Sequence, residues 1–93
     1  MNLPILSSSA KRKIKEATKR SYFHLLDRFE SHRPPEYVKP IQEVHPQLED
    51  TTIRNLFNRR LPLQLALLVE CIKVLKPDFE FPEEVLELTQ TAA

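Results

Sequence analysis

Residues 50–75 read DTTIRNLFNRRLPLQLALLVECIKVL and contain the two patterns that decide the fold. Apolar side chains recur at helical spacing within Ile53–Phe57, behind Asp50, a residue type that favours helix N-caps. We therefore predict a helix from Asp50 to about Arg60. The apolar residues of Leu65–Leu75 repeat three and four apart. This second pattern predicts either the most buried helix of the protein or one that also contacts a partner.

Two further helices are predicted before this stretch. Residues 10–28 contain no proline, follow a serine run that can cap a helix, and repeat their apolar side chains at helical spacing. After a break at Ser31–Pro35 comes a shorter helix, which must begin near residue 37 because Pro40 is tolerated only in a first turn. Its apolar positions are Val38, Ile41 and Val44.

Prolines mark the helix boundaries on the C-terminal side. Pro62 is expected at or just before the first position of the helix that follows it, and Lys76-Pro77 stops that helix. Phe79–Phe81 alternates like a short extended connector. A last helix then starts at about Pro82 and carries the apolar residues of Val85–Leu88.

The predicted fold class is therefore all-α, a compact bundle of about five short helices without a sheet. The 93 residues suffice for one domain. We expect that domain to span residues 9–90, after a flexible lead-in at 1–8 and before a frayed tail at 91–93. The predicted core consists of Leu25, Phe29, Ile41, Ile53, Leu56, Phe57, Leu65, Leu68 and Ile72.

The composition argues against an enzyme. Glycine is absent, which removes the phosphate-binding loop, the dinucleotide-binding turn and the nucleophile elbow. The three histidines share no spacing, and Cys71 lies within an apolar helix. We therefore predict no metal site, no cofactor, no nucleophilic thiol and no small-molecule ligand.

Targeting and membrane signals are not expected either. Met1–Leu6 is apolar but short, and no basic residue precedes it, which argues against a signal peptide. The apolar run around Leu65–Val69 falls well short of the roughly 20 residues that a membrane-spanning helix needs. Because a lone cysteine fits a reducing compartment, we expect a cytoplasmic protein without membrane contact.

Charge is unevenly distributed along the chain. The 14 basic and 13 acidic residues leave a formal net charge of +1. Residues 1–20 nevertheless hold six basic residues and one acid, whereas residues 61–93 hold two basic residues and six acids. This contrast between a basic N-terminal part and an acidic C-terminal part is more informative than the sum.

The outward face of the predicted helix at 50–60 has the composition of a DNA-reading surface. It contains no acid and no large apolar side chain, and consists of Thr51, Thr52, Arg54, Asn55, Asn58 and Arg59. Arginine pairs with guanine, asparagine with adenine, and threonine with phosphate or the thymine methyl group. A plain solvated helix is the alternative explanation of the same residues.

The run Thr52–Pro62, followed by the apolar helix, resembles the second half of the helix-turn-helix in the phage-repressor (Cro-type, lambda-repressor-like) DNA-binding family. In that family the recognition helix carries an inward isoleucine or valine and ends in an apolar residue followed by Asn-Gly and a basic residue. Those places are taken here by Ile53, Leu56-Phe57, Asn58 and Arg60. The resemblance covers about residues 36–76. It departs at Arg59, which replaces the glycine, and in a longer turn that contains Pro46.

The resemblance and the polar face together imply a sequence-specific, DNA-binding transcriptional regulator with a helix-turn-helix at about residues 36–60. Its partner would be double-stranded DNA, read in the major groove by a recognition helix at about 50–60. The expected base contacts are Arg54, Asn55 and Asn58. The expected phosphate contacts are Thr51, Thr52, Arg59, Arg60, Lys11, Arg12, Lys13 and Lys15. Because two half-sites roughly double the contacts, we expect a homodimer formed through residues 65–88.

A helical protein–protein interaction module or adaptor is the alternative function. In that case Leu65–Leu75 and Phe79–Phe81, within an apolar surface at residues 65–81, would form a groove for a partner. The basic N-terminal part would then only solubilise the protein or meet an acidic partner. The acidic C-terminal part and the near-zero net charge favour this alternative.

Overall fold

The computed structural model describes residues 8–90, with side chains from 12 to 89, and confirms the all-α fold class. The lead-in at 1–7 and the tail at 91–93 lie outside the described residues. Within the described part there are five α-helices, one 3-10 turn and no strand. The elements are α1 (Ser8–Phe29), η1 (Glu30–His32), α2 (Val38–Val44), α3 (Asp50–Phe57), α4 (Leu65–Leu75) and α5 (Glu83–Gln90).

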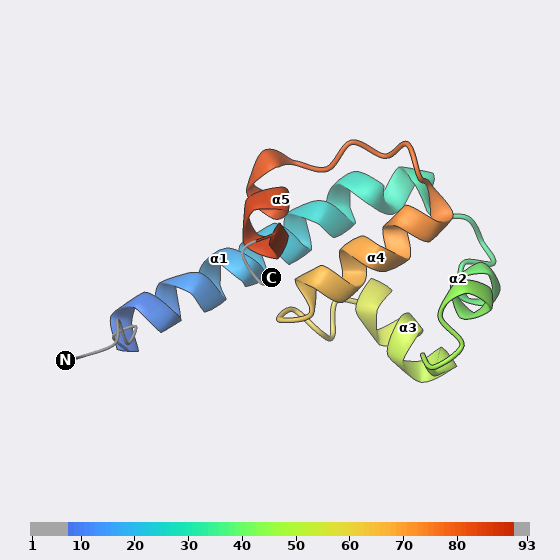
Figure 1. Cartoon of the computed structure of the whole chain (residues 1–93), viewed down its shortest axis with the longest axis horizontal. Helices are drawn as coiled ribbons and strands as arrows, with labels where there is room; N and C mark the ends of the chain where they lie inside the picture. The colour runs from blue at the N-terminus through green and yellow to red at the C-terminus, as the bar shows by residue number, and fades with distance from the viewer. Residues whose placement is uncertain (1–7, 91–93) are drawn as a thin grey trace.

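The long helix α1 sets the shape of the molecule, which measures 51 × 26 × 22 Å. Its C-terminal half packs against α4 and α5, and α2 packs against both α3 and α4. Its N-terminal half extends past the other helices (Figure 1). The compact body is therefore built around the second half of α1, and the first half is not part of it.

One hydrophobic core joins all five helices. All nine residues predicted for it are buried, and Leu68 of α4 is completely inaccessible. α4 contributes the largest share, which identifies it as the central helix of the bundle rather than a free apolar surface. The further apolar members of the core are Tyr22, Leu26, Val38, Val69, Cys71 and Val85.

Helix α2 begins where Pro40 requires it to begin. Val38 is its first residue, so the proline falls within the first turn, where its missing N–H has no helical partner to lose. The prediction that Val44 is an apolar core position is wrong, because this side chain is 58% exposed. Successive steps of three residues rotate around the helix by about 60° each, and the third position leaves the narrow buried face of so short a helix.

Helix α3 ends at Phe57, three residues before the predicted end near Arg60. Arg59 has a φ of 64°, in the left-handed region, which stops the helix. The N–H of Arg60 then donates a hydrogen bond to the carbonyl of Asn55 at 3.1 Å, the backbone closure of a Schellman motif. Asp50 is also not the N-cap that we predicted. It is the first helical residue, and Glu49 precedes it.

Helix α4 begins at Leu65, three residues after Pro62. The prediction that Pro62 occupies the first helical position is wrong because a turn intervenes. The N–H of Gln64 donates to the carbonyl of Leu61 at 3.0 Å, which places the proline at the second position of a β-turn, where its fixed φ is favourable.

Candidate nucleic-acid interface

Helix α3 lies at the edge of the molecule, beside α2 (Figure 1). It buries Ile53, Leu56 and Phe57 and turns its opposite face to solvent. This separation of faces follows directly from the sequence, because apolar side chains three and four residues apart share one side of a helix. The polar residues expected to contact DNA are consequently outside the core.

The exposed face of α3 centres on three of the predicted contact residues. Thr51, Arg54 and Asn58 are all exposed, and their spacing of three and four residues aligns them along one side. Thr52 and Asn55 are half-buried at the margins of that side. Of the three residues expected to contact bases, two are therefore available on the face itself, and Asn55 is at its edge.

Arg54 already has a partner, which corrects the expectation that this face carries no acid. Its guanidinium donates to the carboxylate of Asp50, one turn earlier on the same helix. Both side chains are more than half exposed. This hydrogen bond raises the pKa of Arg54 above its ordinary value. Because the pair is open to water, the guanidinium can exchange the carboxylate for another acceptor.

The turn after α3 brings the next basic residues against α1. Arg59 donates to the carboxylate of Asp27, and this hydrogen bond raises the pKa of Arg59. Arg60 and Asn58 are exposed on either side of it. The predicted phosphate contacts Arg59 and Arg60 thus lie next to α1, with the first of them already in an ion pair.

Tyr22 joins α1 to this turn. Its buried hydroxyl donates to the carbonyl of Leu56 at 2.5 Å and accepts a hydrogen bond from the N–H of Leu61 at 3.3 Å. Burial raises the pKa of Tyr22 above 10.0. Sequence reasoning placed Tyr22 in the apolar stripe and missed this role. A tyrosine at a core position is the available signal, because a buried phenol oxygen needs hydrogen-bond partners.

Arg33 is a second residue that sequence reasoning missed. Its guanidinium donates to the carbonyl of Phe57 at 3.4 Å and stands 5.2 Å from the centre of the Tyr37 ring. It also lines a cavity of about 260 Å³ at the C-terminal end of α3, together with Asn58 and Arg59. A cation at this position is favoured because the helix dipole is negative at its C-terminus.

The predicted basic residues of α1 do not lie on α3. Arg12, Lys13 and Lys15 are exposed on the N-terminal half of the helix, which extends from the body (Figure 1). The side chain of Lys11 lies outside the described residues. Lys19 and Arg20, which the sequence-based list did not include, are exposed on the next turn.

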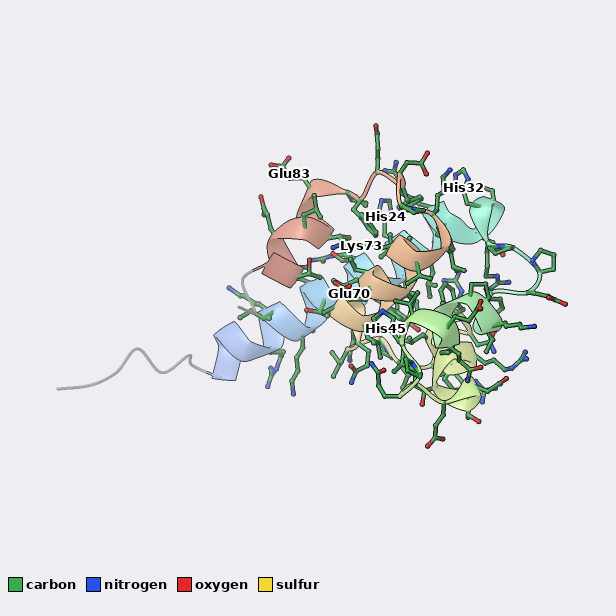
Figure 2. The ribbon with its side chains drawn as sticks, turned by 45° about the vertical axis from the view of Figure 1, so that its right-hand side comes forward. His24, His32, His45, Glu70, Lys73 and Glu83 are labelled. Atoms are coloured by element: carbon green, nitrogen blue, oxygen red, sulfur yellow. The ribbon has the colours of Figure 1, made fainter. Side chains whose placement is uncertain are left out.

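No set of metal ligands converges within the part of the chain that the structure describes. His24, His32 and His45 come from separate elements (Figure 2). The thiol of Cys71 is buried in α4, and burial raises its pKa to about 11. A thiol held in its neutral form at physiological pH is a poor nucleophile.

The apolar surface required by the alternative function is largely inside the molecule. Leu65, Leu68 and Ile72 belong to the core, and the Phe79 ring packs edge-on against Phe29 and Phe81 at centroid distances of 5.3 and 5.1 Å. What remains open is a groove of about 490 Å³ between α4 and α5. Its lining residues are Gln64, Ala66, Leu67, Val69, Glu70, Lys73, Leu86 and Thr89.

Comparison with family models, curated proteins and solved structures finds no match to this chain. Among the described residues, no helix combines the length and apolar character needed to cross a bilayer. The candidate interface therefore stands on its own geometry.

Proposed function

We propose that this protein binds double-stranded DNA and regulates transcription, with α3 as the helix that enters the major groove. The observation that carries the proposal is the alignment of Thr51, Arg54 and Asn58 on the exposed side of a helix at the edge of the molecule. These side-chain types can contact both phosphates and base edges. The resemblance to the phage-repressor family supports the same function.

The proposed recognition is an exchange of hydrogen-bond partners. On the duplex, the guanidinium of Arg54 leaves the carboxylate of Asp50 and donates two hydrogen bonds to the O6 and N7 atoms of guanine. Asn58 supplies an amide at the C-terminal end of the same face. Arg59 and Arg60, in the turn that follows, contact the phosphate backbone beside the groove. No chemical step is involved, and occupancy follows from equilibrium binding.

A homodimer formed through residues 65–88 would let the protein read two half-sites. The open groove between α4 and α5 lies within that range. Half-sites read by a symmetric pair of such helices repeat about 34–36 Å apart, one turn of the duplex. Sedimentation equilibrium measures the oligomeric state with and without DNA, and a monomer under both conditions removes this part of the proposal.

The test of the function is selection from a random-sequence duplex library at physiological salt. We expect a motif of two half-sites, and Arg54→Ala should lose one base preference and weaken binding about 5- to 150-fold. The matched control is Arg28→Ala, which removes an exposed arginine from α1 and should leave the motif intact. If the wild type enriches no sequence, sequence-specific reading by α3 is wrong.

The second candidate function remains a protein–protein interaction module. The α4–α5 groove favours it, because Leu67 and Leu86 line an opening that the core leaves unfilled. In that case Leu67→Glu should abolish capture of the partner, whereas Arg54→Ala should leave capture unchanged. The reverse result favours the DNA-binding function.

A further inference from the structure

The N-terminal half of α1, residues 8–20, is a helix with little covering it. Side chains 12–16 and 19–20 are exposed, and this half of the helix extends beyond the body (Figure 1). Ile14, its large apolar residue, is 47% exposed. Short helices without tertiary packing are marginal in water, so such a segment gains from a partner of opposite charge.

Tyr22 fixes which side of this segment faces the turn that follows α3. With 3.6 residues per turn, positions 100° apart around the axis can be placed relative to the Tyr22 side chain. Lys15 then lies about 20° from Tyr22, Lys19 about 60° and Arg12 about 80°, all in the same sense. Lys13 and Arg20 lie about 180° and 160° away, on the far side of the helix.

Arg12, Lys15 and Lys19 therefore form one row, here named the basic stripe. At 1.5 Å per residue, the stripe begins about 4.5 Å from Tyr22 along the axis and ends about 15 Å from it. Because the hydroxyl of Tyr22 binds the backbone of Leu56 and Leu61, the stripe points along the side of α1 on which Arg59 and Arg60 lie.

The figures agree with this placement. In Figure 1 the extending half of α1, the connection from α3 to α4, and α3 itself follow one another along the lower side of the molecule, while α5 lies on the other side of α1. Figure 2 shows nitrogen-tipped side chains leaving the lower side of the same segment. The cations of α1 and the turn after α3 can thus meet one extended polyanion.

We propose that the basic stripe of α1 holds the phosphate backbone of the duplex that α3 reads. This inference rests on the proposed function and deepens it, because it assigns the flanking contact to one side of α1 and adds Lys19. It also separates Lys15 from Lys13, two residues that the sequence places in one basic run. A phosphate row fits the stripe because cations recur along it without an acid, and Glu16 lies about 120° from Tyr22.

The experiment compares two double variants of the full chain that remove the same charges one position apart. Arg12→Ala/Lys19→Ala removes two members of the stripe, and Lys13→Ala/Arg20→Ala removes one lysine and one arginine from the far side. Binding to a labelled duplex of arbitrary sequence is followed by fluorescence anisotropy between about 50 and 200 mM salt. Circular dichroism verifies that both variants retain the helix.

We expect the stripe variant to reduce the slope of log affinity against log salt by about 1.8, two contacts at about 0.9 each. The far-side variant should reduce it by less than half as much. Equal reductions, or a larger one for the far-side variant, overturn the stripe while leaving DNA binding in place. Absence of duplex binding by the wild type instead overturns the proposed function and the stripe together.

A second measurement separates phosphates from an acidic protein surface. The acidic residues of the C-terminal part, such as Glu80, Glu83 and Glu84, could attract the stripe of another copy. Sedimentation of the stripe variant without DNA should match the wild type. A stripe variant that dissociates a salt-sensitive dimer in the absence of DNA makes the stripe a protein interface and overturns the assignment to phosphates.

Discussion

Arg59 holds a backbone conformation that side chains other than glycine adopt at a cost. Its φ of 64° terminates α3, and the left-handed region costs a residue with a Cβ about 1–2 kcal/mol. The side chain recovers part of that cost through the ion pair with Asp27, which is exposed to water. The position is also the place where the phage-repressor family carries glycine.

Substitution of Arg59 by glycine should therefore leave the protein as stable or more stable. We expect the free energy of unfolding to rise by up to about 1 kcal/mol, because relief of the backbone outweighs a weak surface ion pair. Urea denaturation measures the change. Arg60→Gly is the control, since that residue has no positive φ, and it should lower stability. A larger loss for Arg59→Gly than for Arg60→Gly contradicts the argument.

Tyr22→Phe tests the joint between α1 and the turn after α3. Loss of the hydroxyl leaves the carbonyl of Leu56 and the N–H of Leu61 without this partner, and should cost about 1–3 kcal/mol of unfolding free energy. Tyr37→Phe, which alters a half-buried ring beside Phe57, is the control and should cost less. The measurement is urea denaturation of both variants near neutral pH.

The same tyrosine predicts a dependence on pH. Because burial raises the pKa of Tyr22, the native state favours the neutral phenol. Its contribution to stability is complete below the ordinary pKa of 10.0 and is lost as the pH rises through the higher native value. The difference in stability between the wild type and Tyr22→Phe should accordingly narrow above about pH 10. A constant difference across that range argues against burial of the hydroxyl.

At the scale of the elements, helix periodicity predicts more than helix ends. The five helices and nine core residues follow from apolar spacing, because burial of one face dominates the stability of a short helix. The ends of α3 and the start of α4 depend on single backbone angles at Arg59 and around Pro62. Nothing in side-chain hydrophobicity encodes those angles.

Helix α4 is the element on which the rest of the bundle depends. Leu68→Ala should lower the free energy of unfolding by about 2–5 kcal/mol, because it opens a cavity at a fully buried position. Leu63→Ala removes the same atoms from a side chain that is 49% exposed and should cost well under half as much. Thermal or urea unfolding of the two variants gives the comparison, and equal losses would contradict a core centred on α4.

At the scale of the whole molecule, long-range pairing is the part that sequence reasoning could not supply. The ion pair between Asp27 and Arg59 joins residues 32 positions apart, and Tyr22 reaches backbone 34 and 39 positions away. The candidate base contacts were predictable because their exposure follows from the apolar face of the same helix. Which basic residues of α1 accompany them depends on how that helix is rotated against α3, and only the folded chain fixes that rotation.

The extension of α1 beyond the body also makes the helix a record of its own occupancy in deuterium exchange. Amide hydrogens after Tyr22 are protected by a packed core and should exchange only when the bundle opens. Those of residues 12–19 have helical hydrogen bonds alone to protect them, so they should exchange orders of magnitude sooner. A ligand seated along this segment should slow those amides selectively. Mass spectrometry of one peptide would then reveal binding without a label on either molecule.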